Sequence, residues 1–253
     1  MNLLLFSNST NAGSGYLDHA RGAIEELVAG RRLVFLPFAL DDWGSYTDQV
    51  RTALPGIEVV GAHETGLAEE AILAAEVVFV GGGNTFRLLQ ALEHLDLVEA
   101  LSERVKLGSC DYIGASAGTN VACPTIRTTN DMPIVEVGSF RALDLVPFQI
   151  NPHFTDAHPQ SLMAETRRDR LEQFHERSST PVLGLREGSW LHVRGEDMLI
   201  SGDGGGVMFT RGTATELAVG GSLDRWTYKA EFDDQLPQLL NGHRLRNSSS
   251  RSN

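Results

Sequence analysis

Cysteine is almost absent from the sequence, which has only Cys110 and Cys123 among 253 residues. Two cysteines are too few for a disulfide framework, so we expect both to be structural and the protein to work in a reducing compartment, the cytoplasm. Long apolar runs are also missing, and none approaches the roughly 20 residues that a membrane-spanning helix needs. No basic and then apolar leader precedes the first strand-like segment, so we expect neither secretion nor membrane insertion.

Positive charge is scarce as well, because 21 Lys and Arg stand against 33 Asp and Glu, giving a formal net charge of −12. This balance works against binding to nucleic acid and to anionic membrane surfaces. An anionic substrate would need a local cationic pocket. The sequence does not determine the oligomeric state, although it is compatible with a homodimer.

Short apolar segments alternate with helix-period segments, a pattern typical of an α/β fold with a doubly wound, mostly parallel sheet. After about residue 186, glycine-rich segments predict β-hairpins appended to this sheet. We expect one domain over residues 1–236 and a disordered polar tail over 237–253. The strands are expected at 3–6, 33–36, 57–60, 77–80, 112–115, 145–150 and 182–185.

Two helices are predicted in the first quarter of the chain. The first carries apolar residues from Leu17 to Val28 on one side, and Gly30 follows as a stop signal. The second is expected to begin at Asp41 or Asp42, which are good N-cap residues, and to end before Pro55.

The segment GASAG, residues 114–118, has the pattern G-x-S-x-G directly after an apolar segment and before a helix-compatible one. In a nucleophile elbow the serine occupies a strained turn between strand and helix, so its neighbours must be small. The positions flanking Ser116 are all Gly or Ala. These five letters fit a catalytic elbow and a glycine-rich turn with an incidental serine about equally well.

A serine hydroxyl needs a base to become a nucleophile, and the sequence offers eight histidines. His153 directly follows the predicted strand 145–150. This would place it at the carboxyl edge of a parallel sheet, where α/β proteins bind their ligands. His153 is therefore the candidate base.

Two acids compete to orient His153. Glu187 follows the predicted strand 182–185 and would reach the same edge of the sheet, whereas Asp131 lies in a polar loop between the serine and the histidine in sequence. Strand-end geometry favours Glu187. Asp131 is the alternative. If it does not orient His153, it would hold a substrate amine or hydrogen-bond a residue that contacts the substrate.

An anion-stabilising nest is expected where the segment VVFVGGGNTFRLLQAL passes from strand through glycines into a helix. Backbone N–H groups of Gly82 or Gly83 can point into a cleft there, because glycine has no Cβ to block the approach. Together with the N–H of Ala117 they would form an oxyanion hole. The segment lacks the spacing of a dinucleotide-binding loop and the lysine of a phosphate-binding loop.

The blocks GGGNTF, GASAGTN, TIRTTNDMPIVE, NPHFTDAHP, ETRRDR and LREGSW, in this order, resemble the peptidase E family of serine peptidases, S51, over residues 1–230. The resemblance implies a flavodoxin-like α/β sandwich similar to the class I glutamine amidotransferase domain. It also implies hydrolysis of dipeptides with an N-terminal aspartate (Asp-Xaa) through an acyl-enzyme, with no metal and no cofactor.

The same resemblance implies a role for each candidate residue: Ser116 is the nucleophile, His153 the base, and Glu187 or Asp131 the third member, with Glu187 preferred. The substrate is a small acidic dipeptide, whose carboxylate would bind Arg167 in the ETR block. A guanidinium suits this role because it can grip both carboxylate oxygens. The neighbouring arginines of the ETRRDR block and the polar segment SNSTN, residues 7–11, are weaker candidates.

Three other functions remain open at this stage. A related S51 hydrolase of the cyanophycinase type would act on β-aspartyl-arginine. An amidotransferase-like domain would carry cysteine at the elbow, and both Ser116 and the position of Cys110 before the strand argue against it. A non-catalytic module would keep the scaffold and bind an acidic peptide.

Overall fold

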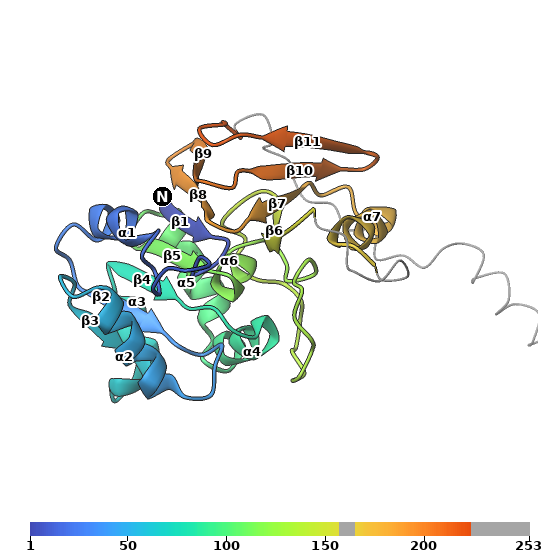
Figure 1. Ribbon diagram of the computed structural model, residues 1–253. Coiled ribbons are helices and arrows are strands. Elements are labelled where there is room, and N and C mark those ends of the chain that lie inside the picture. The colour runs from blue at the N-terminus through green and yellow to red at the C-terminus, as the bar shows by residue number, and fades with distance from the viewer. Residues whose placement is uncertain (157–164, 224–253) are drawn as a thin grey trace, which may run out of the picture.

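The computed structural model describes residues 1–156 and 165–223, which form two β-sheets and their covering helices (Figure 1). The predicted tail, 237–253, and the end of the predicted domain lie outside the described residues. One sheet is seven-stranded, with the order β3-β2-β4-β5-β1-β8-β9, and the other is four-stranded, with the order β11-β10-β7-β6. The mixed α/β class predicted from the sequence is confirmed.

The central sheet is parallel over most of its width. Its parallel strands are β3 (Val59–Gly61), β2 (Leu33–Leu36), β4 (Val77–Val80), β5 (Asp111–Ala115) and β1 (Asn2–Phe6). On the far side of β1, the hairpin of β8 (Ser189–Arg194) and β9 (Asp197–Gly202) adds two antiparallel strands. Two hydrogen-bonded neighbours cover both edges of β1, so its carboxyl end lies in the middle of the molecule.

Helices cover both faces of the central sheet, as expected for a doubly wound fold. Successive residues of β1 alternate between the two cores: Leu3 and Leu5 belong to one, Leu4 and Phe6 to the other. The second core packs under α1 (Arg21–Val28) and α2 (Trp43–Ala53). The first lies under η1 (Ala62–Glu64), α3 (Ala68–Ala74), α4 (Thr85–His94), α5 (Leu97–Lys106) and α6 (Ala117–Val121).

The two helices predicted in the first quarter of the chain are present, and most of their predicted features agree with the structure. Asp42 caps α2, because its side chain accepts a hydrogen bond from the backbone N–H of Ser45 at 2.9 Å. The first helix begins later than predicted, at Arg21. Leu17 has a φ of 60°, a left-handed conformation that an α-helix cannot include, so the first apolar residue of the pattern packs from a turn.

The second sheet is the main departure from the predicted architecture. It consists of β6 (Gln149–Phe154), β7 (Val182–Arg186), β10 (Gly206–Thr210) and β11 (Thr213–Leu217), with α7 (Arg167–Arg177) beside it. The strands expected at 145–150 and 182–185 therefore do not belong to the main sheet. Of the C-terminal hairpins, one extends the central sheet and the other completes the second sheet.

The strand predicted at 145–150 is also misplaced along the chain, since β6 begins only at Gln149. Leu145 and Val146 are buried in the core without belonging to a strand. Pro147 explains the difference, because proline has no N–H to donate and restricts the residue before it. Burial alone produced the apolar pattern here.

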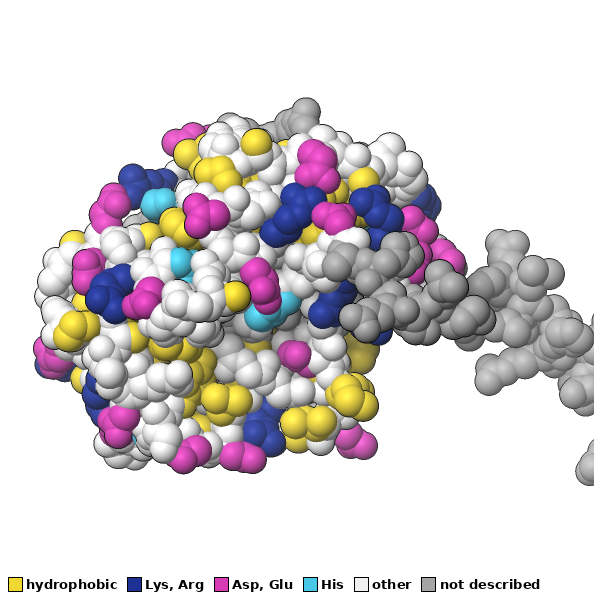
Figure 2. Space-filling model, in the orientation of Figure 1, with side chains coloured by type: hydrophobic (Ala, Val, Ile, Leu, Met, Phe, Trp, Pro, Cys, Tyr) yellow, Lys and Arg dark blue, Asp and Glu magenta, His cyan; other side chains and the backbone are white. Residues whose placement is uncertain are grey.

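Two further observations concern the hydrophobicity of the helices and the charges on the surface. In the parts of the chain that the structure describes, no helix is long and apolar enough to cross a membrane. Figure 2 shows acidic and basic side chains interspersed over the face it presents, with apolar side chains gathered lower on that face.

Candidate active site

Ser116 stands at a sharp turn between β5 and α6, with a φ of 51° and a ψ of −103°. Residues other than glycine rarely adopt positive φ, so the surroundings must hold the turn in place. They do so through β1: Phe6 O accepts hydrogen bonds from Ser116 N–H at 3.1 Å and from the Thr119 hydroxyl at 2.7 Å. On the opposite side, the Tyr112 hydroxyl donates to Gly118 O at 2.7 Å.

The glycines of the elbow are required by close packing. A Cβ on Gly118 would lie 2.1 Å from Val80 O, and one on Gly114 would lie 2.7 Å from the backbone of Gly118. The helix α6 therefore folds back directly onto the central sheet. This contact is the steric reason for small residues on both sides of the serine.

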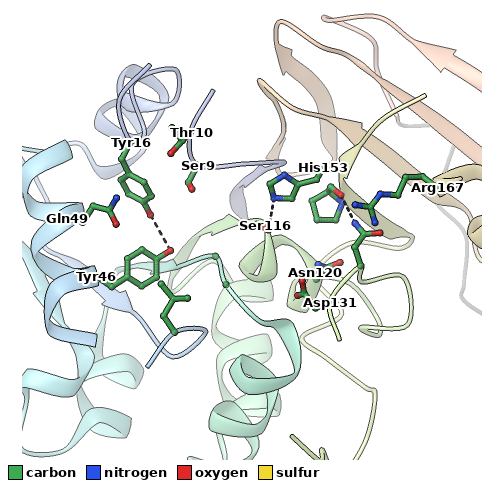
Figure 3. Close-up of a pocket in the computed structure, with 15 residues that line it drawn as sticks. Ser9, Thr10, Tyr16, Tyr46, Gln49, Ser116, Asn120, Asp131, His153 and Arg167 are labelled. Atoms are coloured by element: carbon green, nitrogen blue, oxygen red, sulfur yellow. Dashed lines mark hydrogen bonds between the residues drawn. The ribbon is translucent and has the colours of Figure 1, made fainter. Parts of the chain in front are cut away.

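His153 and Glu187 complete a chain of hydrogen bonds that begins at Ser116. The His153 Nε2 lies 2.9 Å from Ser116 Oγ, and His153 Nδ1 lies 2.7 Å from Glu187 Oε1 (Figure 3 draws the first contact). An ionised carboxylate only accepts hydrogen bonds, so Nδ1 carries the proton in neutral His153. The lone pair of Nε2 then faces the serine hydroxyl.

The route by which His153 reaches the serine differs from the one predicted. It does not follow a strand of the central sheet; it lies inside β6 of the second sheet. The register between β6 and β7 shifts between Asn151 and Phe154, and His153 has a φ of 54°. This irregularity turns the imidazole out of the sheet and toward the elbow.

Asp131 lies in the same pocket but does not bind His153. Its Oδ2 accepts hydrogen bonds from Thr85 N–H at 2.8 Å, from the Thr85 hydroxyl at 2.5 Å and from the Thr129 hydroxyl at 3.2 Å. Of the two acids considered from the sequence, Glu187 is therefore the one that contacts the imidazole. Asp131 is anchored at the amino end of α4, and its loop is tied to β6 because Asn130 donates to Pro152 O at 3.0 Å.

A cavity of about 610 Å³ opens beside Ser116 and is lined on one side by Asn120, Asp131 and Arg167. Tyr16, Tyr46, Gln49, Ser9 and Thr10 line the other side, as Figure 3 shows. Within residues 1–156 and 165–223, no group of three or more His, Cys, Asp or Glu side chains could hold a metal ion.

Tyr16, Tyr46 and Gln49 on this side of the cavity were not predicted from the sequence, whereas Ser9 and Thr10 belong to the polar segment 7–11, a weaker candidate there. The Tyr16 hydroxyl donates to the Tyr46 hydroxyl at 3.3 Å, and burial raises the pKa of both phenols, so both stay neutral near neutral pH. These residues come from an N-terminal loop and from α2, far from any motif. The sequence did contain a signal for Asn120. It follows Ser116 by four residues, a spacing that places both residues on one side of α6.

Arg167, at the start of α7, faces the cavity from the second sheet side (Figure 3). Burial lowers its pKa, as does the nearby Arg170, whereas Asp131 acts in the opposite direction. Among the described residues Arg167 has no carboxylate within salt-bridge distance. Arginine stays protonated in proteins, so the cavity contains a half-buried, unpaired cation.

The neighbouring arginines of α7 are occupied elsewhere. Arg168 lies 3.6 Å from Asp156 and stacks over the Phe209 ring, and Arg170 lies 3.7 Å from Glu165. They are less suited than Arg167 to a ligand in this cavity.

The glycines before α4 border the elbow as expected. A Cβ on Gly82 would lie 3.3 Å from the Cβ of Ser116. Gly83 has a φ of 133°, and a Cβ there would meet Ala39 O at 2.5 Å, so only glycine fits. Burial raises the pKa of Tyr46, while hydrogen bonds from Tyr16 and from the backbone of Gly82 oppose that shift.

Comparison of the chain with known proteins shows to which family it belongs. The model of peptidase family S51 matches residues 3–201. Peptidase E of Streptomyces coelicolor is 54% identical over 239 residues, covering 92% of this chain and 98% of that protein. A probable alpha-aspartyl dipeptidase of Drosophila melanogaster is 46% identical, with coverages of 85% and 92%. The chain belongs to peptidase family S51. It is accordingly a serine peptidase.

Solved structures support the fold. A putative peptidase E from Listeria monocytogenes has a TM-score of 0.59 at 22% identity and covers 79% of this chain and 98% of its own. A peptidase from an acI-B1 actinobacterium has a TM-score of 0.64 at 16% identity, with coverages of 88% and 96%. At these identities the likeness concerns the fold alone.

The packing of the elbow predicts that Gly118→Ala destabilises the protein by about 3 kcal/mol, because a backbone carbonyl occupies the space of the new methyl group. The matched control is Gly22→Ala in α1, where a Cβ would meet open space and should stabilise by about 0.5–1 kcal/mol. Urea unfolding followed by circular dichroism measures both. Equal stability of the two variants would contradict the steric account.

Proposed function

We propose that this chain is a dipeptidase that hydrolyses Asp-Xaa dipeptides through an acyl-enzyme on Ser116. The proposal depends on one observation: the hydrogen-bonded chain of Ser116, His153 and Glu187 opens onto a cavity that contains an unpaired guanidinium. The similarity to a probable alpha-aspartyl dipeptidase of Drosophila melanogaster supports the same reaction.

In the first half-reaction, Ser116 Oγ attacks the peptide carbonyl carbon while His153 Nε2 takes the hydroxyl proton. Glu187 holds the imidazole in this tautomer and stabilises the imidazolium that forms. The tetrahedral intermediate collapses when His153 returns the proton to the leaving amine, and the second amino acid departs. Water then attacks the aspartyl ester, with His153 again taking and returning a proton, and aspartate is released.

The oxyanion of the intermediate needs N–H donors beside Ser116 Oγ. Ala117 is the first residue of α6, so its N–H has no acceptor within the helix. On the facing segment, the N–H groups of Gly82 and Gly83 are the candidates for the second donor. Gly82 contributes by its size, since a side chain there would crowd the serine.

Arg167 is the residue that selects aspartate. Its guanidinium is half-buried and unpaired among the described residues, so a side-chain carboxylate of the substrate gains two charge-assisted hydrogen bonds there. The chain as a whole is strongly acidic, so this local cation is what favours an acidic dipeptide among the described residues that line the cavity.

Asp131 binds the free amino group of the substrate. Its Oδ2 is saturated by the donors of Thr85 and Thr129, which hold the carboxylate still and leave Oδ1 for an ammonium. With the carboxylate on Arg167 and the amine on Asp131, the leaving residue extends toward Tyr16 and Tyr46. This orientation predicts a preference for a free amino terminus.

A cytoplasmic location is supported by the cysteines. Cys110 and Cys123 are both free and buried. Burial raises the pKa of their thiols to about 11 and about 12, respectively, so neither is a nucleophile at neutral pH. This also works against an amidotransferase-like chemistry.

Ser116→Ala should lower kcat for Asp-Leu by on the order of 10⁴-fold or more, because the attacking oxygen is lost. The fold should persist, since alanine has the same Cβ in the strained turn. Steady-state kinetics and circular dichroism measure the two effects. Wild-type turnover by the folded alanine variant would remove Ser116 from the mechanism.

Arg167→Gln should lower kcat/KM for Asp-Leu by about 10²-fold, because the substrate carboxylate loses its charged partner. Turnover of Asn-Leu should change little, so the selectivity between the two substrates should fall. Arg170→Gln is the matched control on the same helix. If both variants lost the same activity, charge around the site rather than a specific contact would explain selectivity.

A panel of Asp-Leu, Glu-Leu, Asn-Leu and β-Asp-Arg tests the substrate class directly. We expect Asp-Leu to be hydrolysed fastest, by about 10²-fold over Asn-Leu, because only aspartate places a carboxylate at Arg167. A preference for β-Asp-Arg would instead indicate a cyanophycinase-like hydrolase. Binding of Asp-Leu without product would indicate a binding module.

A further inference from the structure

Two buried polar residues, Ser7 and Asn8, follow β1 at the seam where the central sheet meets the second sheet. Ser7 is 0% exposed and Asn8 is 2% exposed. Buried polar side chains are normally hydrogen-bonded, so their partners indicate what they hold. Both residues reach across the seam, to the two segments that carry the base and the acid.

Ser7 forms hydrogen bonds with three strands: β6 and β7 of the second sheet and β8 of the central sheet. Its Oγ accepts a hydrogen bond from His153 N–H at 2.8 Å and donates one to Leu185 O at 2.8 Å. Its own N–H donates to Ser189 O at 2.9 Å. The single hydroxyl therefore connects the end of β1 with β6 and β7.

His153 needs this partner because of its own backbone. The β6–β7 register shifts between Asn151 and Phe154, and the positive φ of His153 takes its N–H out of the regular ladder. The imidazole itself is 38% exposed, so packing around the ring does not fix it. The hydrogen bond that His153 N–H donates to Ser7 Oγ therefore fixes the backbone from which the ring projects.

Asn8 does the same for the segment of Glu187. Its Oδ1 accepts a hydrogen bond from Gly188 N–H at 2.9 Å, directly after the acid. Its Nδ2 donates to Thr10 O and to Asn11 Oδ1, each at 2.8 Å. The Glu187 side chain is 60% exposed, so its position also depends on its backbone.

We propose that Ser7 and Asn8 are a pair of positioning residues that set the alignment of His153 and Glu187 with Ser116. Neither touches the reacting atoms. The pair acts through the backbone N–H groups of His153 and Gly188, on the two segments that carry the base and the acid. This inference rests on the proposed function.

Ser7→Ala is the decisive variant, because it removes the acceptor of His153 N–H and adds no volume. We expect kcat for Asp-Leu to fall by on the order of 10- to 100-fold, as small displacements of a base do. KM should stay at its wild-type value, because Arg167 and Asp131 are untouched. Phenylmethanesulfonyl fluoride, which reports serine reactivity without the substrate pocket, should inactivate Ser7→Ala more slowly by a similar factor.

Ser102→Ala is the matched control. Ser102 is also a buried serine whose hydroxyl donates to a backbone carbonyl, that of Leu143, but it lies on α5 away from the site. It should lose stability without losing kcat. Wild-type kcat in Ser7→Ala, or an equal fall of kcat in Ser102→Ala, would overturn the proposal.

If Ser7→Ala does not fold, Asn8→Ala replaces it as the test variant. We then measure kcat for Asp-Leu and the rate of inactivation by phenylmethanesulfonyl fluoride, and wild-type values of both would overturn the proposal. The outcome is separable from that of the proposed function. Activity of Ser116→Ala would refute the mechanism itself, whereas an inert Ser116→Ala beside a fully active Ser7→Ala would refute only the positioning role.

Discussion

The contact between His153 Nε2 and Ser116 Oγ, at 2.9 Å, is the interaction on which the rest of the site depends. It joins side chains from two different sheets: the serine stands on a turn after β5, and the histidine projects from β6. Neither sheet alone contains a nucleophile and its base. The alignment of the sheets is therefore a catalytic requirement as well as a matter of packing.

The elbow was readable from the sequence because its constraints are local. Small residues on both sides of Ser116 are enforced by contacts within β5, α6 and the adjacent β4. Which sheet each strand joins could not be predicted from the sequence. The segments predicted as strands at 145–150 and 182–185 are mostly apolar, like those of the central sheet, and nothing in their composition says which neighbours they pair with. The placement of these two segments in the main sheet was wrong for this reason.

His153 and Glu187 were selected from the sequence because each was expected at the carboxyl edge of a parallel sheet. Their strands, β6 and β7, are indeed parallel neighbours, but they belong to the second sheet, and a register shift inside β6 turns the imidazole toward the elbow. Tyr16 and Tyr46 were not assigned roles, and Ser7 and Asn8 were named only within the polar segment 7–11, because the partners of these residues lie far away in sequence. Only the folded chain shows those contacts.

The partial exposure of the base and its acid affects how an ester on Ser116 would be broken down. The side chains of His153 and Glu187 are 38% and 60% exposed, so bulk water reaches the imidazole directly. A nucleophile for deacylation is then always at hand, without a stored solvent molecule or a dedicated channel. The same openness screens the charge pair, which leaves geometry rather than electrostatic strength as the main contribution of Glu187.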